Sequence, residues 1–121
     1  MTVPAPSDWR RAAFVLFAVA AGTNALLVAR FQGHGSIIQS SGCMVRILVD
    51  STTMEPDGNY AFMGQANVSE SVAGSGSIER SMPVGPGTYT VKAQLRISTA
   101  NNVNSQCQLS GWHFAVERHR R

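Results

Sequence analysis

The stretch Thr88–Ile97, TYTVKAQLRI, alternates polar and apolar residues without a break. Its apolar positions are Tyr89, Val91, Ala93, Leu95 and Ile97. Successive side chains of a β-strand point to opposite faces, so this period of two predicts a half-buried strand. The preceding Pro83–Gly87, PVGPG, consists mostly of turn-forming residues and predicts a turn that leads into the strand.

The same period recurs in other segments. Cys43–Asp50, CMVRILVD, and Gly111–Arg118, GWHFAVER, predict two more strands, and Trp112 is expected to point inward in the second. Shorter candidates are Tyr60–Ala66 and Gly76–Met82. Glycine-rich Val72–Ser77, VAGSGS, is expected to be a flexible loop.

An uncharged run, Ala12–Ala29, follows two arginines near the start of the chain. It has the parts of a secretory signal peptide ending near Ala20, and its length is at the lower limit for a membrane helix. However, Gly22-Thr23-Asn24 would interrupt such a helix. We therefore favour two strands, Phe14–Val19 and Ala25–Phe31, joined by this turn in a hairpin.

Composition favours a β-rich fold and sets its size. The chain has 121 residues, of which 44% are hydrophobic, only 14% are charged and eleven are glycine. These values favour a single β-rich domain. The strand segments above, counted with the hairpin and the turns between them, predict an all-β, single-domain β-sandwich of jelly-roll type with about eight antiparallel strands. The domain is expected to span 1–121, with an N-terminal arm at 1–11 and a basic tail at 118–121. Three arginines in that tail account for the net charge of +3, so no nucleic-acid partner is expected.

Two cysteines, Cys43 and Cys107, lie sixty-four positions apart. They form either a disulfide, in an oxidising compartment, or two small buried thiols. The three histidines are scattered singly, so the sequence predicts neither a metal site nor a cofactor. Asp50–Asn59 gathers oxygen donors, but a turn explains that segment better than a calcium site.

No catalytic constellation is found in the sequence, and the protein is not expected to be an enzyme. There is no G-x-S-x-G motif, and no histidine lies beside an acid as in a triad. Arg30, Arg46 and Arg96 occupy polar faces of predicted strands, where they would pair with acids or form an interaction surface. Trp112 would either pack in the core or provide a stacking platform for a sugar.

The order of four segments resembles uncharacterised bacterial and phage-associated jelly-roll domains. The segments are ALLVARF (25–31), CMVRILVD (43–50), VGPGTYTVKAQLR (84–96) and GWHFAVER (111–118). Ser51 stands where a glycine usually follows in that group, so a longer turn is expected there. The arrangement is also distantly similar to the tumour-necrosis-factor-type jelly roll, which implies homotrimers on fibres, capsids or spores.

Two functions follow from these observations. The first is a non-enzymatic structural or adhesion module that assembles as a homo-oligomer, with trimers expected, on a virion or other particle surface. Its partners would be copies of itself and other virion or surface proteins, and no membrane span is expected. The alternative is a secreted binding module for carbohydrate or a cell-surface ligand, with residues 1–21 removed as a signal peptide.

Overall fold

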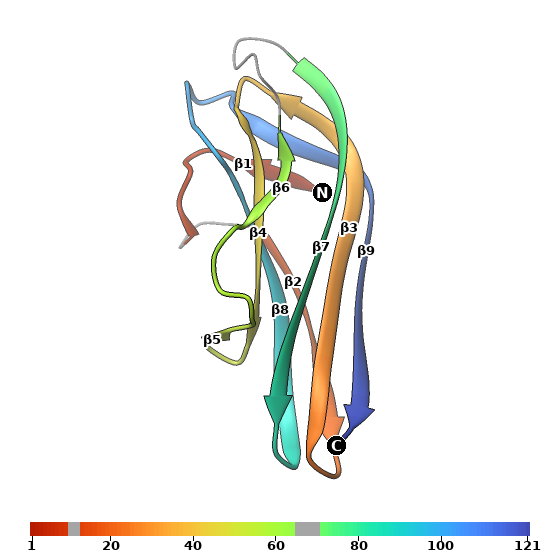
Figure 1. Ribbon diagram of the computed structural model, residues 1–121. Coiled ribbons are helices and arrows are strands. Elements are labelled where there is room, and N and C mark those ends of the chain that lie inside the picture. Colours follow the sequence, from red (N-terminus) through yellow and green to blue (C-terminus); the bar gives the residue numbers. More distant parts are fainter. Residues whose placement is uncertain (10–12, 65–70) are drawn as a thin grey trace.

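Two antiparallel sheets face each other in a computed structural model that describes residues 1–9, 13–64 and 71–121 (Figure 1). The described residues form strands and no helix. The strands are β1 (Thr2–Pro4), β2 (Ala13–Ala21), β3 (Ala25–Ile38), β4 (Gly42–Val49), β5 (Thr52–Thr53), β6 (Ala61–Gly64), β7 (Ser71–Val84), β8 (Gly87–Ile97) and β9 (Gln106–Arg120). The predicted strand at 88–97 is confirmed as β8.

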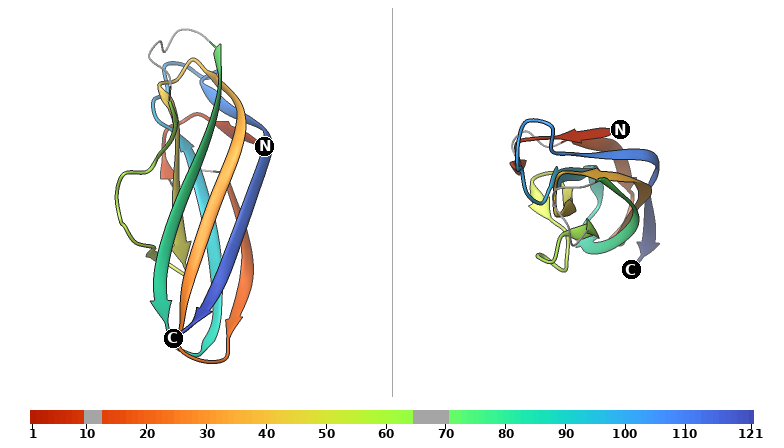
Figure 2. Two further views of the ribbon diagram at one scale, coloured as in Figure 1. Left: turned by 45° about the vertical axis from the view of Figure 1, so that its right-hand side comes forward. Right: turned by 90° about the horizontal axis from the view of Figure 1, so that it is seen from above.

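One sheet has the order β1-β9-β3-β7, and the other has the order β2-β8-β4-β5 with β6 also paired to β4. Seen from above, the two layers enclose the core between them (Figure 2). Pairing joins the chain from its two ends inward: β1 pairs with β9, β2 with β8, β3 with β7, and β4 with β5 and β6. A ribbon of paired strands rolled into two sheets is a jelly roll, so the predicted fold class is confirmed.

The predicted N-terminal hairpin is wrong in its pairing, although the run does divide into two strands at Gly22-Thr23-Asn24. β2 pairs with β8 in one sheet, whereas β3 pairs with β7 and β9 in the other. The turn therefore crosses from one sheet to the other. Ala21 and Ala25 are buried on its two sides, since their small side chains fit where the chain changes layer.

Alternation along the strands builds the core. Val91, Ala93, Leu95 and Ile97 of β8 are fully buried, as the period of two predicts, and their polar neighbours face outward. In the other sheet, Phe31 is the largest fully buried side chain, and it contacts Phe62 of β6 at a ring-centroid distance of 5.4 Å. Each large apolar side chain buried in this way contributes roughly 1.5–3 kcal/mol.

The expected glycine-rich loop at Val72–Ser77 is instead the first half of β7. A Cβ on Gly76 would lie 2.0 Å from the carbonyl oxygen of Phe62, so the close approach of β6 requires glycine there. Sequence reasoning treated glycine as a loop signal, but here it permits two backbones to pack closely.

Both chain ends take part in the sheet. Val3 in β1 is fully buried opposite Cys107, within the region expected to be an arm. β9 continues through Arg120, so the residues expected to form a basic tail mostly extend a strand. This strand lies between β1 and β3, and the C-terminal end of β9 lies close to the β2–β3 turn (Figure 1).

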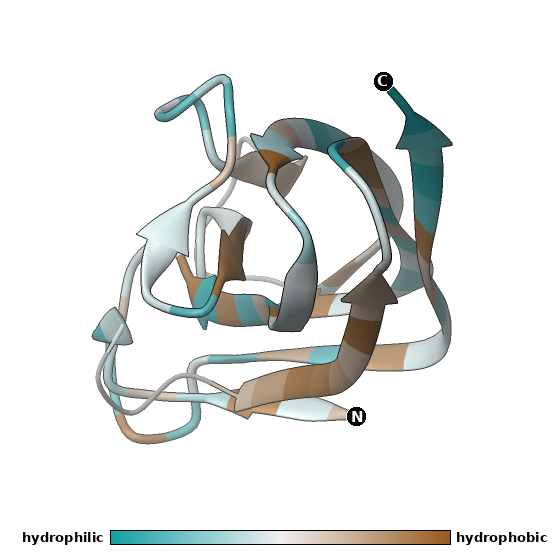
Figure 3. Ribbon diagram, turned by 90° about the horizontal axis from the view of Figure 1, so that it is seen from below, coloured by the Kyte–Doolittle hydropathy of each residue, from teal (hydrophilic) through white to brown (hydrophobic). Residues whose placement is uncertain are grey.

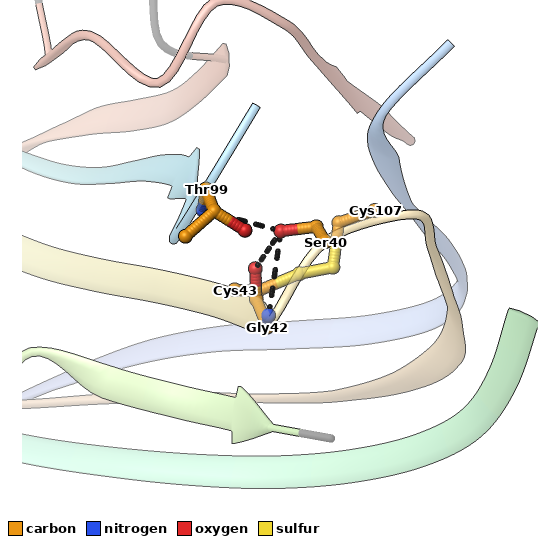
Figure 4. Close-up of a disulfide and its surroundings, with 5 residues drawn as sticks. All are labelled: Ser40, Gly42, Cys43, Thr99 and Cys107. Atoms are coloured by element: carbon orange, nitrogen blue, oxygen red, sulfur yellow. Dashed lines mark hydrogen bonds between the residues drawn. A yellow bond between two sulfur atoms is a disulfide. The ribbon is translucent and has the colours of Figure 1, made fainter. Parts of the chain in front are cut away.

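A disulfide joins Cys43 at the start of β4 to Cys107 at the start of β9, and so links the two sheets (Figure 4). Their Cα atoms are 6.3 Å apart, and both side chains are buried. The buried Ser40 hydroxyl lies beside it, where it accepts a hydrogen bond from the Thr99 N–H at 3.3 Å. This end of the sandwich is therefore held by covalent and hydrogen bonds together.

In the part of the chain that the structure describes, no helix is long and apolar enough to cross a membrane.

Candidate ligand-binding site around Trp112

A shallow depression of about 700 Å³ crosses the middle of β7, β3 and β9. We call it the Trp112 depression. Its lining residues are Gln32, Gly33, His34, Ser75, Gly76, Ser77, Gly111, Trp112 and His113. Most of the side chains in this lining can form hydrogen bonds, and none is a carboxylate.

Strand register brings these residues together from three distant parts of the sequence. Gln32 of β3 pairs with Ser77 of β7 and with His113 of β9, forming one polar row across the sheet. In the next row, Gly33 lies between Gly76 and Trp112. Gly33 has no side chain to cover the indole, and Gly76 beyond it is covered by the backbone of Phe62.

Trp112 lies on the core-facing side of β9, as predicted, but the residue is 44% exposed. Its ring stacks on buried Phe31 with a centroid distance of 6.0 Å and an interplanar angle of 11°. At this level β9 has passed beyond the short β1, which pairs only with Gln106–Gln108. The prediction that Trp112 points toward the core is therefore correct, but the prediction that it is buried there is wrong.

His34 is oriented by a β-bulge. The register of β3 against β9 shifts between His34 and Gly35, and bulges of this kind redirect side chains. The imidazole lies over Gly111, where a Cβ would come within 2.6 Å of Nε2. The Ser110 hydroxyl donates a hydrogen bond to the His34 carbonyl at 3.3 Å.

This arrangement suits binding better than catalysis. Ser110 Oγ is 3.5 Å from His34 Nδ1, which is too long for an effective nucleophile–base hydrogen bond, and the lining supplies no acid to orient the imidazole. Among the described residues, no group of three or more His, Cys, Asp or Glu side chains is placed to hold a metal ion. Because successive side chains of a strand alternate, the polar row of Gln32, Ser77 and His113 faces outward, whereas the Trp112 indole lies on the core-facing side of β9. The first can form hydrogen bonds to a ligand, and the second offers a partly exposed aromatic surface at the border of the depression.

Arg46 and Arg96, two of the predicted surface arginines, lie together on the other sheet and hold the N-terminal segment. Their guanidinium carbons lie 4.6 Å and 4.8 Å from the centroid of the Trp9 ring. Arg96 also donates to Ser7 Oγ at 2.6 Å, and Arg46 donates to Gln94 at 2.7 Å. These cations therefore bind their own chain.

Arg30 lies on the four-stranded sheet and pairs with Glu79 of β7, at 2.6 Å between Nη2 and Oε2. The hydrogen bond to Glu79, reinforced by its negative charge, raises the already high pKa of Arg30. The four residues predicted to form an interaction surface therefore do not lie together. Arg46 and Arg96 contact Trp9, Arg30 pairs with Glu79, and only Trp112 lines the depression.

The acidic segment 50–59 uses its side-chain oxygens in hydrogen bonds to its own loop and to the neighbouring strand β8. Asp50 accepts a hydrogen bond from the Thr90 N–H at 2.9 Å, and Glu55 accepts one from the Asp57 N–H at 3.2 Å. The Tyr60 hydroxyl donates to Asp57. These contacts agree with the expected turn. The glycosylation sequon Asn67–Ser69 lies outside the described residues.

Sequence reasoning missed most of the lining, although a signal was present. QGHGS (32–36) and GSGS (74–77) both alternate glycine with polar residues. Such alternation gives a strand with one bare face and one polar face.

Comparisons with known proteins show a distant structural likeness. No family model matches the chain, and no curated protein matches it. Among solved structures, the fold is similar to a family 35 carbohydrate binding module from an environmental isolate. The identity is 8%, the match covers 91% of this chain and 72% of that one, and the TM-score is 0.48.

Proposed function

We propose that this protein is a secreted, non-catalytic binding module that holds a saccharide at the Trp112 depression. The observation that carries the proposal is the outward polar row of Gln32, Ser77 and His113, with the partly exposed Trp112 ring, held against Phe31, on the other side of the same strand. A saccharide that crosses the edge of β9 would meet both groups, because sugar rings offer hydroxyls for the polar row and an apolar C–H face for the indole. The open shape of the depression fits a portion of an extended chain better than an enclosed small molecule.

Secretion is supported by the buried disulfide, because such bonds persist in oxidising compartments. The segment first considered as a cleaved signal contains two strands of the sandwich. Its removal would take away all nine β2 residues paired with β8 and the buried Val3. We therefore propose that residues 1–21 stay in the functional protein.

The experiment is a glycan-binding screen followed by titration of the best saccharide, with tryptophan fluorescence as the readout. The chain has two tryptophans, so each serves as a control for the other. Trp112→Phe should abolish the fluorescence response and Trp112→Ala should abolish binding, whereas Trp9→Phe should retain both. Gln32→Ala and His113→Ala should each weaken binding about fivefold, the effect of losing one hydrogen bond. Equal binding by Trp112→Ala and the parent protein would contradict the proposal.

A homo-oligomeric particle-surface subunit is the second proposal, supported by the outward face of β2. Phe14 and Leu16 are 55% and 50% exposed there, on a strand without a charge. Mass measurement in dilute solution tests it: a trimer is expected, and a monomer at micromolar concentration would contradict it.

A further inference from the structure

One side of the sandwich has two strand edges without partners among the described residues. β2 pairs only with β8, and β9 pairs with β1 only over Gln106–Gln108, followed by hydrogen bonds between Met1 and Leu109. From Ser110 to Arg120, no strand in the described part of the chain pairs with the edge of β9 turned away from β3. Unpaired N–H and C=O groups on such an edge can pair with another extended chain.

The side chains between these edges are apolar and only partly covered. Phe17 of β2 contacts Phe114 of β9 at a centroid distance of 5.2 Å, yet Phe17 is 36% exposed. Trp112 is also exposed, and Val116 is only partly buried. Figure 3 shows β2 hydrophobic along its whole length, beside the hydrophilic end of β9. We call this region, from Trp112 to Arg120 along β9 and facing β2, the open edge.

β1 is an example of a strand that pairs with this edge of β9. It runs antiparallel to β9 and inserts Val3, which is fully buried, opposite Cys107. A strand continuing along the same edge would place alternate side chains opposite Trp112, Phe114 and Val116. It would therefore cover the apolar contacts that the three-residue β1 leaves open.

The charged residues of β9 indicate which side chains an added strand would carry at its N-terminal end. Beyond Val116, the edge carries Arg118, Arg120 and Arg121, whereas Glu117 is engaged with His119 at 3.0 Å. The Arg118 guanidinium donates to the Ala20 carbonyl, so this side chain reaches the unpaired edge of β2. An antiparallel strand has its N-terminal end beside these arginines, and acidic side chains would suit that end.

We propose that the open edge binds an extended peptide by strand addition, antiparallel to β9. Counting from the residue opposite Arg120, its first and third residues are acidic, and its fifth, seventh and ninth are apolar. Main-chain hydrogen bonds supply affinity, while the acidic and alternating apolar side chains supply selectivity. This role is separate from saccharide binding, although Trp112 lies at the upper end of the open edge.

The test uses the full chain and a fluorescent synthetic peptide, ETETVTVTV, followed by anisotropy. A charge-reversed peptide, KTKTVTVTV, should bind at least about tenfold more weakly, and added salt should weaken the parent peptide. Two versions of the parent peptide are N-methylated, one at its odd-numbered residues and the other at its even-numbered residues, so that each lacks a different set of N–H donors. One should lose binding and the other retain it, because only one set can face β9.

Protein variants locate the site. Arg120→Glu should weaken the acidic peptide about tenfold and strengthen its lysine counterpart, whereas Lys92→Glu, the same charge change on the other sheet, should not. Thermal unfolding of both variants should match the parent. Absence of binding at roughly millimolar peptide, or equal binding by both N-methylated versions, would overturn the proposal.

Discussion

Phe31 and Trp112 lie with their ring planes inclined by only 11°, one fully buried and the other half in solvent. Phe31 also contacts Phe62 and Phe114, so the exposed indole is the outer member of an aromatic cluster that reaches the core. The shape of the Trp112 depression therefore depends on the core behind it. A change in the core should alter both stability and ligand binding.

Phe31→Ala tests this dependence. Removing a fully buried phenylalanine should lower the free energy of unfolding by about 3–5 kcal/mol, because burial is lost and a cavity is left behind. Denaturant titration measures the change. Phe14→Ala is the matched control: its ring is 55% exposed, and its loss should cost under about 1 kcal/mol. Similar losses in the two variants would show that Phe31 does not anchor the core.

Reduction of the Cys43–Cys107 disulfide should destabilise the fold by about 4 kcal/mol, because the bond closes a loop spanning sixty-four positions. Chemical denaturation with and without reductant gives the difference. The Cys43→Ala, Cys107→Ala double variant should be destabilised under both conditions and insensitive to reductant. A parent protein equally stable with and without reductant would contradict the prediction.

Gly76→Ala should destabilise the protein by at least about 2 kcal/mol. The added methyl would overlap the backbone carbonyl of Phe62, and a backbone atom cannot move aside as a flexible side chain can. Gly22→Ala is the control, since nothing lies within 4 Å of its Cβ position. Thermal unfolding of the two variants should separate them clearly, and equal melting temperatures would show that β6 does not press against β7.

Tyr60 should titrate above its ordinary pKa. The hydrogen bond to Asp57 is the main cause, and burial and the negative charge of Asp57 also raise this pKa. The stabilisation is complete below the ordinary value of 10.0 and is lost as pH rises through the higher folded-state pKa. Spectrophotometric titration should show Asp57→Asn lowering the pKa of Tyr60. An unchanged titration curve would exclude the interaction.

The sequence allowed the fold class to be predicted because the period of two is a local property, visible without knowledge of the partner strand. Segments such as 88–97 therefore indicated strands directly. Pairing could not be read in this way: the uncharged run divides at Gly22-Thr23-Asn24, yet its halves join different sheets. The same applies to the candidate site. The alternation along β9 predicts on which face Trp112 lies, but the exposure of Trp112 depends on where β1 ends, which the sequence does not reveal.

The pairing of the first strands with the last also affects how the chain folds. β3 lies between β7 and β9, and β9 supplies residues 106–120, so the four-stranded sheet cannot close until those residues leave the ribosome. Contacts between residues so far apart in sequence make folding slow, because a long loop must close before they form. During synthesis, apolar β2 has no partner until β8 emerges. This molecule therefore completes its folding only after β9 has emerged, and the risk of aggregation is greatest while β2 has no partner strand.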